Sequence, residues 1–366
     1  MTKVTLSPEG RRDWLRLART ENVGAVTFEA LIQRFGDAAR AIEALPELAR
    51  RGGRAHAPRT PSIEEADREL AAGEALGATL LTNRESAFPR HLAAIDGPPP
   101  LIWARGDPAL LARPCVAIVG ARNASAAGQR FARNLAEALG KQGYVVVSGL
   151  ARGIDAAAHE ASLSTGAAAV LGGGVDDVYP PEHADLYARI AARGCILSES
   201  PIGYRAQARD FPRRNRLISG LSLGVIVVEA EMRSGSLITA RLAAEQGREV
   251  FAVPGSPLDP RAAGCLELLR QGATLCAGPD DVLRVLESLP RFEEPARDWE
   301  GAPGKPAEPD ERLRGKIAEL LSSAPVSRDE LVRITRASPA EVGAALVELT
   351  LAGKAEMLSG GMVVRP

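Results

Sequence analysis

Residues 115–155, CVAIVGARNASAAGQRFARNLAEALGKQGYVVVSGLARGID, decide the fold of this chain. Residues 116–119 and 144–147 are continuous apolar runs, which are typical of strands buried on both faces. Residues 126–141 between them follow helical spacing. Strand, helix and strand in this order predict a βαβ unit with parallel strands. Ligands bind beyond the carboxyl ends of such strands, so we expect the site at the two glycine turns that follow them.

Strand and helix patterns alternate on both sides of this unit. The predicted strands are 79–82, 100–103, 167–171, 195–198, 224–229, 250–253 and 273–276, and the predicted helices are 182–193, 237–246, 265–270 and 280–289. This alternation predicts an α/β domain with a doubly wound parallel sheet over residues 78–289.

The predicted N-terminal domain, residues 1–77, is helical. Ser7-Pro8 starts a helix, and Asn22-Val23-Gly24 forms a turn before a second helix at 27–35. This helix–turn–helix resembles sterile-alpha-motif-like or helix-hairpin-helix modules. Its twelve basic residues are balanced by twelve acidic ones, so we favour a packing or interaction role over DNA binding.

Prolines and acidic residues dominate residues 290–309, which predicts a stiff, solvated linker. Residues 310–366 then suggest three short helices and a terminal hairpin, the pattern of a winged helix. Its recognition helix, residues 338–352, contains Glu341 and Glu348 but no Lys or Arg, which favours protein interaction over reading of DNA. We expect the linker to isolate this domain, so that deleting residues 291–366 leaves DNA binding intact.

Composition narrows the class of protein. The 366 residues carry a net charge of −1, so any nucleic-acid surface must be local. No apolar run approaches the roughly 18 residues of a membrane span, and four scattered cysteines suit a reducing compartment. We expect a soluble, cytoplasmic protein without membrane partners.

The sequence carries no pattern for catalysis or cofactor binding. It has neither a P-loop nor a G-x-G-x-x-G after the first strand, and its four histidines have no metal-ligand spacing. No nucleophile and base can be placed together. We therefore predict a binding protein, not an enzyme, with no cofactor and no metal.

Four glycine-containing turns follow predicted strands. They are Gly120-Ala121-Arg122, the turn from Ser148 through Gly149, Arg152 and Gly153 to Asp155, Gly172-Gly173-Gly174, and Ser234-Gly235-Ser236. Such turns can expose backbone N–H groups, and the helices after them point their positive ends the same way. Together they predict an anion-binding ledge, with ordinary turn chemistry as the alternative.

A local basic cluster lies between residues 205 and 216. Arg205, Arg209, Arg213, Arg214 and Arg216 surround a single acid, Asp210. Phe211 and Asn215 add an aromatic ring and an amide to the guanidinium groups. Stacking combined with phosphate contact is how proteins hold single strands. This favours single-stranded nucleic acid over a small phosphate ligand.

These motifs, together with Val228-Glu229-Ala230, Ser234–Ala240 and Val250–Gly255, resemble the DNA-processing protein A family over residues 78–290. The resemblance implies an extended Rossmann-like domain that binds single-stranded DNA and forms a homodimer. It also implies a recombination mediator that protects incoming strands and loads the RecA recombinase during natural transformation.

The resemblance also assigns roles to residues. Arg122 is the phosphate-binding arginine of the first turn, Ser148, Gly149 and Gly153 line the second, and Arg213, Asn215 and Arg216 belong to a basic face beside Ser234, Gly235 and Ser236. Removing Arg122, Arg214 or Arg216 is then expected to lower affinity without changing stability. Some members carry a DNA-contacting lysine where this sequence has Pro181. A nucleotide phosphoribohydrolase-like hydrolase or a nucleotide sensor are the alternatives, although Ser234–Ala240 offers no acid for base–sugar cleavage.

Overall fold

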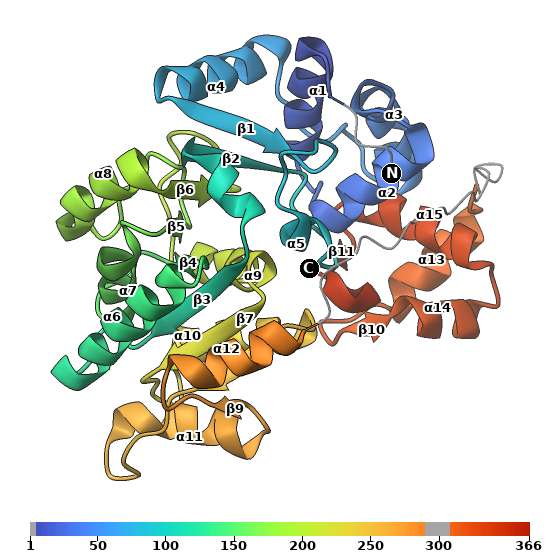
Figure 1. Cartoon of the computed structure of the whole chain (residues 1–366). Coiled ribbons are helices and arrows are strands. Elements are labelled where there is room, and N and C mark those ends of the chain that lie inside the picture. Colours follow the sequence, from blue (N-terminus) through green and yellow to red (C-terminus); the bar gives the residue numbers. More distant parts are fainter. Residues whose placement is uncertain (1–4, 290–307) are drawn as a thin grey trace.

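The computed structural model describes residues 5–289 and 308–366 and is built around one nine-stranded sheet (Figure 1). The strand order is β1-β2-β6-β5-β4-β3-β7-β8-β9. The strands are β1 Ala78–Thr82, β2 Leu101–Gly106, β3 Cys115–Gly120, β4 Val145–Ser148, β5 Ala167–Val170, β6 Cys195–Ser198, β7 Gly224–Val228, β8 Glu249–Ala252 and β9 Thr274–Leu275. The predicted α/β class and the doubly wound core are confirmed.

Seven of these strands, β3 to β9, are parallel, but β1 and β2 are not. β1 pairs antiparallel with β2, which pairs antiparallel with β6. The chain between β1 and β2 contains only the one-turn helix α5 (Arg90–Ala93), too short to cross the sheet and return parallel. The expectation of a wholly parallel sheet is therefore wrong at this edge.

The parallel strands β3 to β7 are buried on both faces, as their apolar runs predicted. Val116 and Ile118 of β3 face a core with α6 (Ala126–Lys141) and α7 (Ile154–Ser162). Ala117 and Val119 face the opposite core, with α9 (Asp210–Leu221) and α10 (Gly235–Glu245). α8 (Ala184–Arg193), α11 (Ala263–Arg270) and α12 (Pro279–Ser288) complete the layers.

The strand order reverses direction between β3 and β7. From β3 the chain builds β4, β5 and β6 to one side, and β7, β8 and β9 to the other. Ligands of such sheets bind where the order reverses, at the carboxyl ends of the strands. The turns after β3 and β4 lie at this edge.

Four helices form the N-terminal domain: α1 (Pro8–Ala18), α2 (Ala25–Phe35), α3 (Ala38–Arg51) and α4 (Ile63–Ala75). Trp14 of α1 fixes this domain to the sheet, because its indole N–H donates to the Pro100 carbonyl at 2.8 Å. Sequence reasoning missed α3, which contains Pro46 and starts at the N-cap Asp37, whose carboxylate accepts from the Arg40 N–H.

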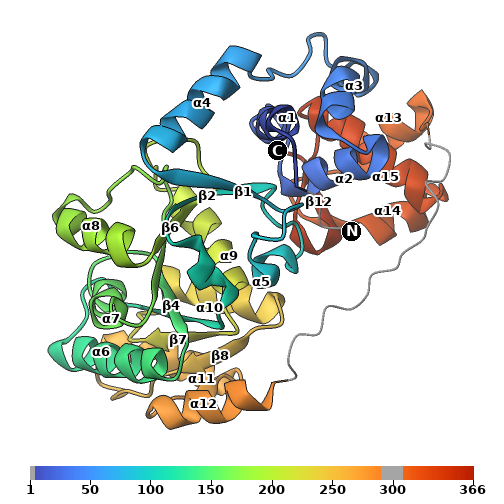
Figure 2. The same ribbon diagram turned by 45° about the horizontal axis from the view of Figure 1, so that its top comes forward.

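The C-terminal residues form the predicted winged helix. Its helices are α13 (Glu311–Leu320), α14 (Arg328–Thr335) and α15 (Pro339–Leu351), beside a sheet of β10 (Val326–Ser327), β12 (Met362–Val364) and β11 (Glu356–Met357). The domain is not isolated: α15 packs against α2 and α3 (Figure 2). The expectation of isolation is therefore wrong, and most of the predicted linker, residues 290–307, lies outside the described residues.

Within the described ranges, none of the helices combines the length and apolar character needed to cross a membrane.

Candidate nucleic-acid interface

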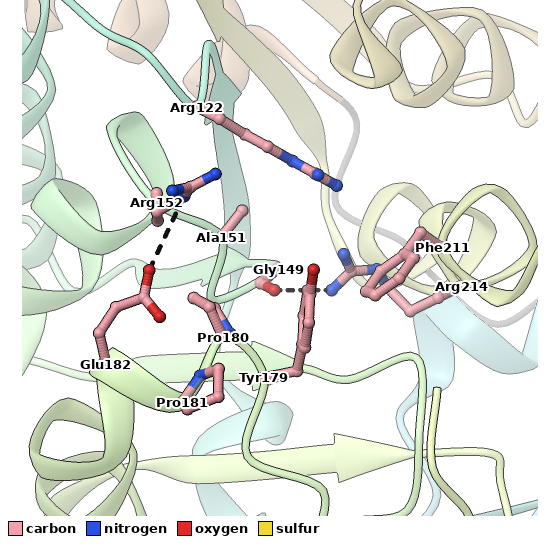
Figure 3. Close-up of a pocket in the computed structure, with 10 residues that line it drawn as sticks. All are labelled: Arg122, Gly149, Ala151, Arg152, Tyr179, Pro180, Pro181, Glu182, Phe211 and Arg214. Carbon is pink, nitrogen blue, oxygen red and sulfur yellow. Dashed lines mark hydrogen bonds and ion pairs between the residues drawn. The ribbon is translucent and has the colours of Figure 1, made fainter. Parts of the chain in front are cut away.

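A pocket opens where the turns after β3 and β4 meet the start of α9 (Figure 3). It occupies about 610 Å³, including the part open to solvent. Its lining residues are Arg122, Gly149, Ala151, Arg152, Tyr179, Pro180, Pro181, Glu182, Phe211 and Arg214. Residues from the first two turns and the arginine-rich segment thus line one site.

Two aromatic rings and two arginines form the outer part of this pocket, which we call the rim: Arg122, Arg152, Tyr179 and Phe211. The ring centroids of Tyr179 and Phe211 lie 5.3 Å apart, and Tyr179 is 48% exposed. The Arg122 guanidinium lies 5.8 Å from the Phe211 centroid, and Figure 3 shows its side chain extending across the pocket. An unpaired base can stack on such rings while the guanidinium contacts its phosphate.

The charges of the two rim arginines are little compensated. Arg152 has Glu182 as its nearest acid at 3.8 Å, and both side chains are more than half exposed. Around Arg122, no carboxylate among residues 5–289 and 308–366 comes within ion-pair distance. An exposed ion pair at 3.8 Å contributes little to stability, so both guanidinium groups can donate hydrogen bonds to a phosphate.

A buried group, which we call the floor, supports the pocket: Gly149 and Arg214 line the pocket, and the buried Asp155 and His159 lie next to them. Arg214 is only 8% exposed and donates to the carbonyl oxygens of Gly149, at 2.9 Å, and Val170. A Cβ atom at Gly149 would lie 2.5 Å from Arg214 Nη1, so a side chain at this position would displace the guanidinium group. Burial lowers the pKa of Arg214 to about 10.

Asp155 completes the floor from the other side of the turn. Its carboxylate accepts from the N–H groups of Gly149 at 3.0 Å and Ala151 at 3.3 Å. Burial raises the pKa of Asp155, and the nearby Arg214 charge opposes that rise. His159 is fully buried beside these groups, and burial lowers its pKa to about 3.

Asp155 engages part of the predicted ledge, because it binds the N–H groups of Gly149 and Ala151. Beside the turns, the Glu229 carboxylate accepts from the Ser125 N–H at 2.8 Å at the start of α6, and Asp177 accepts from the Ala206 N–H at 2.8 Å. The guanidinium groups of Arg122 and Arg152 supply exposed positive charge at the pocket. Anion binding by the remaining N–H groups of the turns stays a prediction.

The glycines bring the two turns together. Gly153 has a φ of +76°, and a Cβ atom there would lie 2.3 Å from the Ala121 carbonyl oxygen. At Gly120 a Cβ atom would lie 1.9 Å from the Val228 carbonyl oxygen. Ser148 is buried and its hydroxyl donates to the Ile118 carbonyl at 2.7 Å. These three residues shape the site; Ser148 is buried, whereas Gly120 and Gly153 are partly exposed, and their contact with DNA stays a prediction.

The arginine-rich segment divides between surface and interior. Arg213 is exposed, whereas Arg216 is 19% exposed and makes two hydrogen bonds of 2.5–2.6 Å to the Glu199 carboxylate. Asn215 is buried and donates to the Gly235 carbonyl at 3.2 Å, which ties α9 to the Ser234–Ser236 turn. Because both guanidinium groups are bonded within the protein, we now expect removal of Arg214 or Arg216 to lower stability, contrary to the expectation from the sequence. Contact of these residues with DNA stays a prediction.

Sequence reasoning did not assign Tyr179, Pro180, Pro181 or Glu182 to the site. The signal was present, since an aromatic residue in a strand-end loop is a candidate stacking platform. Pro181 lies in the pocket where some relatives carry lysine, and Arg152 on the opposite turn supplies a cation there. In the described part of the chain, no three His, Cys, Asp or Glu side chains gather as metal ligands would.

Comparison with known proteins gives three family matches along the chain. The family model of DNA recombination-mediator protein A matches residues 79–287, a DprA-like N-terminal HHH domain matches 8–72, and a DprA winged helix domain matches 301–361. Protein Smf of Synechocystis is 34% identical, over 93% of this chain and 95% of its own length. DNA processing protein DprA of Bacillus subtilis is 42% identical, over 60% of this chain and 75% of its own.

Two solved structures are similar as well. DNA processing protein A from Streptococcus pneumoniae superposes with a TM-score of 0.63 and 33% identity, covering 77% of this chain and 98% of that one. The protein from Helicobacter pylori, whose structure concerns its single-stranded DNA binding mode, gives 0.53 and 31%, covering 57% of this chain and 95% of its own. The chain belongs to the DNA recombination-mediator protein A family.

Proposed function

We propose that this protein binds single-stranded DNA in the rim pocket and acts without catalysis as a recombination mediator. The observation that carries the proposal is the placement of Arg122 and Arg152 around the adjacent rings of Tyr179 and Phe211. Rings and cations in one pocket suit a base and its phosphate together. The single-stranded DNA binding of the relative from Helicobacter pylori supports the same ligand class.

Single strands fit this pocket better than duplexes for a physical reason. The rings can stack only on a base that has left its own stack, and in a duplex this costs a few kcal/mol. No recognition helix presents arginines to a groove, because α15 contains two glutamates and no basic residue. Binding should therefore depend on strandedness and little on sequence.

The mediator role includes protection of incoming strands and loading of the RecA recombinase during natural transformation, in the cytoplasm. Membership of the recombination-mediator family supports this role. A homodimer through the Rossmann-like domain is part of the same proposal. It is supported by the short edge strand β9, where Leu275 is 49% exposed, and by Leu258 after β8, which is 94% exposed. Light scattering of the intact protein checks the dimer.

The test of binding uses fluorescence anisotropy with labelled oligothymidylate, the matching duplex and free nucleotides at two salt concentrations. Oligothymidylate should bind most tightly, without ATP or metal, and its affinity should fall as salt rises because phosphate contacts release counterions. Equal affinity for the duplex, or tight binding of a mononucleotide with no dependence on strand length, would contradict the proposal.

A further inference from the structure

The outer face of α15 is covered by the protein's own N-terminal helices. Val347 and Leu351 of α15 belong to the apolar core of the N-terminal domain, whereas Val342 and Leu346 belong to the winged-helix core. Both views show α15 beside α2 and α3 (Figures 1 and 2). α15 is therefore buried on two sides by two different domains.

The two domains approach each other closely at Gly52, just after α3. A Cβ atom at Gly52 would lie 2.0 Å from the Glu348 carbonyl oxygen and 2.9 Å from the Ala352 Cβ atom. Gly52 has φ −69° and ψ −8°, which any residue adopts easily. The contact with α15, and not the local backbone conformation, is what requires glycine here.

Polar contacts surround this approach. Arg54 donates to the Leu351 carbonyl at 3.4 Å, and Arg51 forms an ion pair of 3.4 Å with Glu308. On the far side of the winged helix, the Gly360 N–H donates to the Asp96 carboxylate in the loop before β2. Three separate segments of the C-terminal domain are thus attached to the rest of the chain.

The contact is also complementary in charge. Glu348 is fully buried and pairs with Arg314 of α13 at 2.9 Å. Burial raises the pKa of Glu348, and the positive charges of Arg314, Arg34 and Arg51 oppose that rise. Arg34 and Arg51 belong to α2 and α3, so the N-terminal domain presents cations toward the one acid buried on α15.

We infer that the winged helix is a docking module whose partner is the N-terminal domain of the same chain. The recognition helix is the element that helix-turn-helix proteins place in the major groove. Here its outer face is occupied by α2 and α3, and it carries no Lys or Arg. The domain therefore stabilises and covers the N-terminal helices, a role separate from the proposed binding of single strands at the rim.

The test is Gly52→Ala in the full-length protein, followed by hydrogen–deuterium exchange. The added methyl group should push α15 away, so amides of residues 345–351 should exchange at least tenfold faster. Val347→Ser disturbs the same contact from the α15 side and should give the same result. The matched control is Gly315→Ala in α13, where a Cβ atom meets nothing within 4 Å and exchange should stay as in the wild type.

Three results would overturn the inference. Unchanged exchange in both Gly52→Ala and Val347→Ser would show that α15 does not dock on this surface in solution. A gain in duplex affinity when α15 is released would show that α15 binds DNA and is blocked by the N-terminal helices, and that the winged helix is not a docking module. Exchange is measured over a hundredfold dilution series, and protection should be independent of concentration. Protection lost on dilution would assign the contact to two copies of the chain.

Discussion

The rim and the floor of the pocket use the same residue type for opposite purposes. Arg122 and Arg152 on the rim are exposed and have little or no acidic compensation, so their charges are available to a ligand. Arg214 on the floor is buried, and its guanidinium is committed to two carbonyl oxygens of the protein. An arginine in a binding site is therefore a ligand contact or a support according to its burial, and each assignment predicts a different mutant phenotype.

The largest difference should appear on removal of the buried arginine. Arg214→Ala deletes two hydrogen bonds and leaves the buried Asp155 carboxylate without its neighbouring cation, which should cost about 3–5 kcal/mol of unfolding free energy. Denaturant unfolding measures this loss. Arg213→Ala, at the exposed neighbouring position, is the matched control and should unfold within about 0.5 kcal/mol of the wild type.

Lowering the pH should reduce the free energy of unfolding through His159 of the floor, and not through the rim. His159 has a pKa of about 3 when folded and about 6.5 when unfolded, so between these values only the unfolded state binds the proton. Its contribution to stability is therefore complete above pH 6.5 and falls as pH decreases, by about 1.4 kcal/mol per unit.

The comparison of wild type with His159→Leu isolates this contribution. His91, with a pKa of about 4, acts in the same direction in both proteins, and Asp155, with a raised pKa, acts in the opposite direction. Unfolding free energies at pH 7 and pH 5 should show a drop about 2 kcal/mol larger in the wild type. Identical pH profiles would mean that His159 titrates normally in the folded protein.

Loss of a rim ring should weaken binding with little effect on folding. Tyr179→Ala removes a half-exposed platform, and base stacking is worth about 1–3 kcal/mol per base, or roughly 5- to 150-fold in affinity. Tyr179→Phe keeps the ring and should bind oligothymidylate like the wild type. If Tyr179→Phe were as weak as Tyr179→Ala, the hydroxyl and not the ring would be the contact.

The same contrast explains what sequence reasoning achieved. The apolar runs at β3 and β4 and the helical spacing of α6 were sufficient for the parallel core, because strand burial and helix period are local signals. The antiparallel pairing of the edge strands β1 and β2 could be predicted only from the path of residues 83–100. Pro46 interrupted the helical pattern of α3, so that helix was missed. Docking of α15 depends on the missing Cβ at Gly52, which no local pattern reveals.

The glycine turns marked the edge of the sheet at which the pocket opens, and Arg122 and Phe211 both line that pocket. That this pocket is the binding site stays a prediction. Burial separates Arg213 from Arg214 and Arg216, although the three lie within four residues. Which of these side chains is buried depends on the rotation of α9 and on acids such as Glu199, which lies outside α9. Asp155 likewise engages the N–H groups of Gly149 and Ala151, which the glycines alone had suggested were free.

The salt dependence of oligothymidylate affinity for Arg122→Ala is the most direct test of the account. If Arg122 contacts one phosphate, the slope of log affinity against log salt should become shallower by about 0.7, with an unchanged melting temperature. Arg312→Ala, an exposed position on α13 away from the pocket, should leave both unchanged. An unaltered slope in Arg122→Ala, or a lowered melting temperature with it, would place Arg122 among the supports and contradict the assignment of the rim to DNA.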